Sequence, residues 1–191
     1  MDLFTFNISW MTYNLYLAAL PVAFSLILFR MPNKFFTAIL AFLWLLYLPN
    51  TIYVFTDLQH LIEQWSMVGN IGKGVLLFQY TILEVIGLAC FLIAFHPWEK
   101  ILQKYTHSSK QFILGIVGIN FLIGFAMVLG RIERVNSWDV LLNPIFVLSS
   151  TLHVVTSYEM IGLTILFGLF SNLFYFLFRE KVKMLYIKWI K

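Results

Sequence analysis

The pattern of apolar and polar positions along the chain predicts membrane-spanning helices. Several apolar stretches reach about 20 residues, the length a helix needs to cross the hydrocarbon core of a bilayer. We place five spans at about residues 8–29, 35–55, 75–95, 112–129 and 160–178. Arg30 and Arg179 follow the first and the last of these spans, so a basic residue marks the end of each.

A sixth apolar stretch, residues 140–155, is shorter and is interrupted by Asn143, Pro144 and His153. Only a few residues separate it from the last span, so a further crossing would need a very tight turn. We expect an interfacial or re-entrant helix on the outer side, over about residues 138–155. The predicted fold is an all-α integral membrane protein, a bundle of five transmembrane helices plus this outer helix, forming a single polytopic membrane domain over residues 1–191.

Composition agrees with this prediction and excludes several classes of protein. Hydrophobic residues make up 61% of the chain and charged residues 12%, about half the charged share of a soluble domain. An ordinary soluble enzyme, a disordered tail and a disulfide scaffold are therefore excluded. Cys90 is the only cysteine, so the chain has no intramolecular disulfide and no thiolate metal site.

Basic residues predict the orientation in the membrane. With five spans and the N-terminus outside, ten of the thirteen Lys and Arg residues fall in cytoplasmic segments, and only Lys73, Arg131 and Arg134 remain outside. This distribution follows the positive-inside rule. The net charge of +4 therefore reflects topology and indicates no nucleic-acid partner, because the bases lie at span ends. The cytoplasmic segments 96–100 and 106–110 read as turn-like connectors without chemistry.

Polar residues collect at the outer end of the second predicted span. Pro49 is expected to kink that helix, and four polar residues follow it within roughly an 80° arc of one helical face. They are Asn50, Tyr53, Asp57 and His60. Such a stripe is costly against lipid, so we expect it to face the bundle interior or a wet cavity.

A second polar group follows the fourth predicted span and contains Arg131, Glu133, Arg134, Asn136 and Asp139. Asn136 and Asp139 have the spacing of a capping box at the start of the outer helix. The guanidinium of Arg131 suits a carboxylate or a phosphate.

Glu84 lies near the middle of the third predicted span, where an ionisable side chain suggests function. The alternative is a protonated or hydrogen-bonded Glu that holds helices together. In the fourth span, Gly115, Gly118 and Gly124 with Asn120 predict a close-packed helix interface.

The sequence contains no specific catalytic motif, which leaves the chemistry open. Asp57 and His60 could offer two metal ligands, with His153, Asp139 or Glu84 completing a site. Alternatively, Arg131 with Asp57, His60 and Asp139 could hold the phosphate of a lipid-linked substrate while His60 acts as a base. No particular cofactor is indicated, and the bilayer is the one partner that the composition requires.

Two stretches resemble a bacterial multi-pass membrane family. They are Leu48-Pro49-Asn50-x-x-Tyr53-x-x-Thr56-Asp57-Leu58-x-His60-Leu61 and Gly130-Arg131-x-x-Arg134-x-Asn136-Ser137-Trp138-Asp139. The family is domain-of-unknown-function family thirteen-sixty-one, and Val135 stands where its pattern has an aromatic residue. The resemblance implies a polytopic protein of the bacterial cytoplasmic (inner) membrane, and it brings no activity or cofactor.

Three hypotheses about function follow. The first is a structural, accessory or transport-linked protein whose outer polar residues form a packing network. The second is a membrane-embedded enzyme acting on a lipid or lipid-linked phosphate substrate at the outer leaflet. The third is a sensor or ion pathway that uses Glu84 and Asp57.

Overall fold

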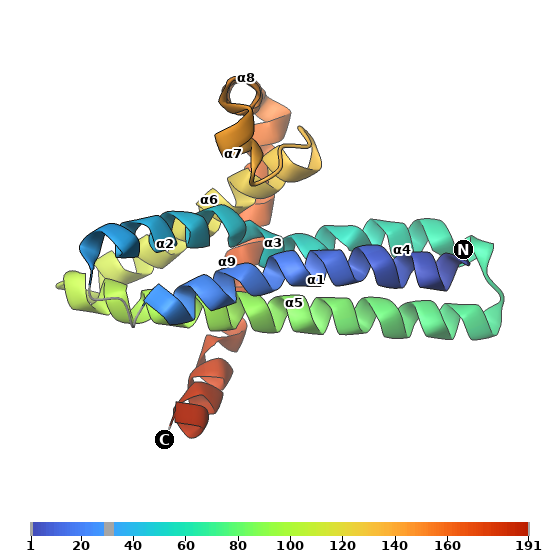
Figure 1. The fold of residues 1–191 in the computed structure, drawn as a ribbon, viewed down its shortest axis with the longest axis horizontal. Helices are drawn as coiled ribbons and strands as arrows, with labels where there is room; N and C mark the ends of the chain where they lie inside the picture. Colours follow the sequence, from blue (N-terminus) through green and yellow to red (C-terminus); the bar gives the residue numbers. More distant parts are fainter. Residues whose placement is uncertain (1, 29–32, 191) are drawn as a thin grey trace. The chain divides into compact units, whose positions relative to one another are not determined.

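The structure is a computed structural model that describes residues 2–28 and 33–190, with side chains described up to Glu180. The described residues form helices and no strand (Figure 1). The elements are α1 (Leu3–Leu28), α2 (Lys34–Tyr47), α3 (Pro49–Tyr53), η1 (Val54–Asp57), α4 (Leu58–Gln64), η2 (Trp65–Met67), α5 (Asn70–Tyr105), α6 (Ser109–Arg131), α7 (Asp139–Leu142), α8 (Pro144–Thr156) and α9 (Tyr158–Ile190).

Five helical segments are long and apolar enough to cross a membrane, which confirms the predicted number of spans and the all-α class. They are Leu3–Leu28, Lys34–Met67, Asn70–Tyr105, Ser109–Arg131 and Tyr158–Glu180. Each helix extends beyond the predicted span at one end or both. Hydropathy locates the apolar middle of a helix, whereas backbone hydrogen bonding continues into the polar ends.

The second span is divided into short helices. Pro49 has no N–H to continue the ladder of α2, and the Thr51 N–H and hydroxyl both donate to the Leu48 carbonyl at 3.1 and 2.7 Å. The chain then passes through the 3₁₀ turn η1 before α4 begins at Leu58. Because a 3₁₀ helix advances by about 120° per residue, the uniform α-helical angle used to predict the polar stripe does not hold across η1.

Contacts divide the chain into two compact units, Met1–Ala94 and Phe95–Lys191, and the division falls inside α5. That the two units form a single membrane domain stays a prediction. In the first unit, α1 packs against α2 and α3 (Figure 1). Hydrogen bonds from Thr5 to the Asp2 carboxylate begin α1 and lower the pKa of that carboxyl below its ordinary value.

A buried apolar cluster joins α1, η1 and α5 in the first unit, and it contains Met11, Val54, Leu76, Tyr80 and Leu83. Beside it, α5 approaches the α3–η1 segment closely at Gly87. A Cβ at Gly87 would lie 2.9 Å from the Thr51 carbonyl oxygen and would overlap the Val54 side chain. Glycine therefore allows the two backbones to meet at this point.

In the second unit, α6 packs against α9. A Cβ at Gly124 would lie 2.6 Å from the Thr164 carbonyl oxygen and 2.9 Å from the Cα of Gly168. Asn120 donates a hydrogen bond to Asn172 at 3.0 Å in the same interface. The close helix packing predicted for this face is present at Gly124, whereas nothing lies within 4 Å of a Cβ at Gly118.

The outer apolar stretch forms two helices, α7 and α8, where we predicted one. Asn143 separates them: its backbone is not helical, and its side chain accepts a hydrogen bond from the Phe146 N–H at 3.4 Å. With 13 residues, α8 is about 20 Å long, shorter than the hydrocarbon core of about 30 Å. Its length agrees with an interfacial or re-entrant helix.

Candidate functional site

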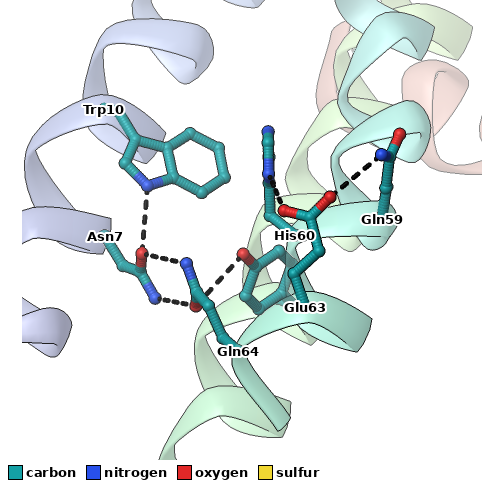
Figure 2. A network of polar contacts seen from close by, with 7 residues as sticks. Asn7, Trp10, Gln59, His60, Glu63 and Gln64 are labelled. Carbon is teal, nitrogen blue, oxygen red and sulfur yellow. Dashed lines mark hydrogen bonds and ion pairs between the residues drawn. The ribbon is translucent and has the colours of Figure 1, made fainter. Parts of the chain in front are cut away.

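A buried pair of amide side chains lies at the centre of the polar residues in the first unit (Figure 2). Asn7 of α1 donates to the Gln64 Oε1 atom at 2.7 Å, and Gln64 of α4 donates back to the Asn7 Oδ1 atom at 3.0 Å. Trp10 donates to the Asn7 Oδ1 atom at 3.0 Å, and the Tyr80 hydroxyl of α5 donates to the Gln64 Oε1 atom at 3.4 Å. Three helices therefore meet at one hydrogen-bonded group, which we call the amide network: Asn7, Trp10, Gln64 and Tyr80.

His60 lies beside the amide network and interacts with an acidic neighbour (Figure 2). Its Nδ1 atom is 3.1 Å from Glu63 Oε2, and Gln59 donates to the other oxygen of Glu63 at 2.9 Å. The imidazole also meets the Trp10 ring edge to face, with the ring centroids 5.8 Å apart. His60 is thus oriented by the carboxylate one turn along its own helix.

Asp57, at the end of η1, is the buried member of the predicted stripe, with 3% of its surface exposed. Asn14 of α1 donates to its Oδ2 atom at 2.9 Å. Asn50 and Tyr53 are only partly buried, and Asn50 donates to the Tyr47 carbonyl at 3.0 Å. Asp57 is therefore more deeply buried than Asn50, Tyr53 and His60, and the shared face of these four residues stays a prediction.

Glu84 of α5 lies close enough to Asp57 for their charges to interact. Both carboxyl oxygens of Glu84 are buried, and neither has a hydrogen-bond partner within the part of the chain that the structure describes. An unpartnered acid inside a membrane helix is costly, so its presence requires an explanation.

The second unit contains the polar residues that follow α6. Asp139 Oδ2 accepts hydrogen bonds from the Asn136 N–H at 2.7 Å and from the Asn136 side chain at 3.1 Å. A capping box includes such a bond from the N-cap N–H to the side chain three residues later. However, α7 begins after Trp138, so Asn136 is not its N-cap. The capping prediction was therefore right about the contact and wrong about the cap.

A second contact in this unit joins the loop after α6 to α8. His153 Nδ1 lies 2.7 Å from Glu133 Oε1. In the loop between α6 and α7, Arg134 is exposed and adopts a left-handed backbone with φ 58°. Arg131 is partly buried at the end of α6.

The predicted site residues are divided between the two units. Asp57, His60 and Glu84 belong to the first, and the second holds Arg131, Arg134, Asn136, Asp139 and His153. Among the residues that the structure describes, no three His, Cys, Asp or Glu side chains are grouped to hold a metal ion. A catalytic site shared by the two sets stays a prediction.

Sequence reasoning missed the α1 half of the amide network. Asn7 and Asn14 are seven residues apart, which places them on the same face of α1, and this spacing is visible in the sequence. The pairing with Gln64 carries no comparable local signal, because 57 residues separate Gln64 from Asn7.

The segment 96–100, which we expected to be a turn-like connector, is a helical part of α5 with buried polar side chains. Glu99 is 2% exposed, accepts a hydrogen bond from the Tyr175 hydroxyl of α9, and lies 3.6 Å from His96 Nδ1. Pro97 suggested a turn, but α5 continues through it to Tyr105. The expectation was therefore wrong, and this cluster holds α5 to α9 in the second unit.

Comparison with known proteins identifies the family. Residues 13–174 match the family described as "Protein of unknown function (DUF1361)". The chain belongs to this family. The match includes all the site residues discussed above except Asn7, Trp10 and Tyr175. No curated protein and no solved structure matches this DUF1361 protein, so its function has to be argued from its own residues.

Proposed function

We propose that this DUF1361 protein is a structural or accessory polytopic membrane protein, whose outer polar residues hold its helices together. Its location would be the bacterial cytoplasmic membrane, with the N-terminus outside and the C-terminus in the cytoplasm. The basic residues support this orientation, because most of them fall on the side assigned to the cytoplasm.

The reciprocal hydrogen bonds between Asn7 and Gln64 carry this proposal. Each amide donates to the other and accepts from it, so the pair uses its polar atoms on protein partners instead of presenting them to a ligand. Polar side chains that bond across helices stabilise membrane bundles where the hydrophobic effect between helices is weak. The same logic applies to Asn14 with Asp57, at 2.9 Å.

A double-mutant cycle tests the proposal. Asn7→Leu and Gln64→Leu should each cost about 1–3 kcal/mol, because each leaves a buried amide without its partner. The double variant should cost less than the sum, with a coupling of roughly 0.5–2 kcal/mol. Gln59→Leu is the matched control, because Gln59 is exposed and donates to Glu63 of its own helix. Unfolding of the purified protein in detergent gives these values, and a coupling near zero would refute a packing role for the pair.

The enzyme hypothesis predicts a different outcome for a second set of variants. Asp57→Asn, His60→Ala and Arg131→Lys should then abolish a cellular phenotype while leaving expression and melting temperature nearly unchanged. A packing role predicts that any lost phenotype follows lost stability in each variant. Measuring both quantities for each variant separates the two hypotheses.

A further inference from the structure

Glu84 occupies a position that the packing proposal does not explain. It is about 21 Å along α5 from the start of that helix, within the apolar segment that we assign to the membrane. A Glu that holds helices together would bond to a neighbouring helix. Both oxygens of Glu84 are buried without such a bond to any described residue, so this role does not fit.

Close packing explains why Glu84 and Asp57 lie near each other. Gly87 meets the Val54 side chain, whereas Tyr80, nearer the start of α5, bonds to Gln64, further along the chain than Val54. Residues later in α5 thus contact residues earlier in the η1–α4 segment, so the two segments run antiparallel. Glu84 lies about one turn before Gly87 in α5, and Asp57 lies about one turn after Val54. Because the segments are antiparallel, both residues lie on the same side of the contact between Gly87 and Val54.

Polar side chains continue in that direction toward the start of α5. Asp57 and Glu84 form the first layer, with Asn14 bonded to Asp57. The amide network forms the next layer, where Tyr80 bonds to Gln64. In the predicted topology this end of α5 faces the outer side. Polar side chains therefore lie between Glu84 and the outer end of α5, where apolar side chains alone would be expected.

We propose that Glu84 is a proton-binding site that exchanges protons with the outer side of the membrane past Asp57 and the amide network. In the exchange, the Glu84 carboxylate takes up a proton from water and becomes a neutral acid, and it later returns that proton. The titratable groups around this route are Asp57 of η1, Tyr80 of α5, and His60 and Glu63 of α4. This activity goes beyond the packing role and does not depend on it.

The choice of a proton over a metal ion follows from the ligand groups. A bound metal cation needs several oxygen or nitrogen donors around it, and no group of three His, Cys, Asp or Glu side chains is found in the described residues. A proton needs one carboxylate oxygen and a route to water. A neighbouring carboxylate such as Asp57 makes uptake at Glu84 favourable, because two like charges in a medium of low dielectric repel each other.

Labelling with dicyclohexylcarbodiimide tests the proposal, because this apolar reagent reacts with protonated carboxyl groups in membranes. The purified full-length protein in detergent is treated between about pH 5 and pH 9, a range that covers shifted carboxyl groups, and labelled peptides are identified by mass spectrometry. We expect labelling at Glu84 that falls at least tenfold as the pH rises. Glu84→Gln should remove this label, and Glu159→Gln, which changes an exposed carboxylate in the first turn of α9, should keep it.

Three results would overturn the proposal. Glu84 could remain unlabelled at every pH in a protein whose melting temperature shows that it is folded. Labelling could be constant across the pH range, which would identify a permanently neutral packing residue. Protection by sodium or potassium at fixed pH would instead identify a cation site. Loss of coupling between Asn7 and Gln64 would refute the packing role alone, so the two proposals fail separately.

Discussion

Replacing Gly124 with Ala tests the contact between α6 and α9 most directly. The new methyl group would lie 2.6 Å from the Thr164 carbonyl oxygen and 2.9 Å from the Cα of Gly168, where ordinary contacts begin at about 3.4 Å. The atoms in the way belong to the backbone of α9, so no side-chain rotation relieves the overlap. The two helices must separate by nearly 1 Å.

The cost has two parts. Overpacking a well-packed interface costs about 1–3 kcal/mol. Separation also lengthens the hydrogen bond from Asn120 to Asn172, now 3.0 Å, and an interhelical bond of this kind in a membrane protein contributes about 0.6 kcal/mol. We therefore expect Gly124→Ala to lower the free energy of unfolding by about 2–4 kcal/mol.

Gly118→Ala on the same helix is the matched control. Nothing lies within 4 Å of its added methyl group, so the variant should be as stable as the wild type, or more stable by up to about 1 kcal/mol from helix propensity. Unfolding of the purified proteins in detergent, followed by the loss of the native elution peak on size-exclusion chromatography, gives the comparison. Equal stability of the two variants would show that α6 and α9 do not meet at Gly124.

Three further predictions concern other parts of the chain. Arg134→Gly should raise stability by up to about 1 kcal/mol, because glycine adopts φ 58° without strain; a loss of stability in thermal unfolding would indicate an unseen contact of the arginine. Tyr175→Phe should cost about 1–3 kcal/mol in the same assay because it removes a donor to buried Glu99, and a neutral effect would contradict that bond. In a variant without the native cysteine, Asn70→Cys and His107→Cys should react with an impermeant maleimide from opposite sides of the membrane, and labelling from the same side would refute the five-span topology.

The number of membrane spans and their helical type could be predicted because the signal is local. A run of about 20 apolar residues has one stable form in lipid, a helix, whatever the rest of the chain does. The break at Pro49 was also predictable from the missing N–H. The 3₁₀ turn after it was not, and Asp57 is the last residue of that turn.

The partners of the polar residues could not be predicted, because pairing depends on which helices meet. Asn7 and Gln64 are each ordinary polar residues in sequence, and only the packing of α1 against the later helices brings their amides together. Glu99 was missed for the same reason, since its partner Tyr175 lies on α9. Glu84 was noticed from its depth in a span, which is a property of its own helix.

The distance in sequence between Asn7 and Gln64 has a consequence for biosynthesis. At synthesis rates of about 5–20 residues per second, the ribosome needs roughly 3–11 s to make the 57 residues from Ile8 to Gln64. During that interval α1 enters the insertion machinery or the lipid without the later partners of Asn7 and Asn14, which are Gln64 and Asp57. Early segments of this protein therefore need a temporary hydrogen-bonding environment, from water or from the translocation channel, until α4 arrives.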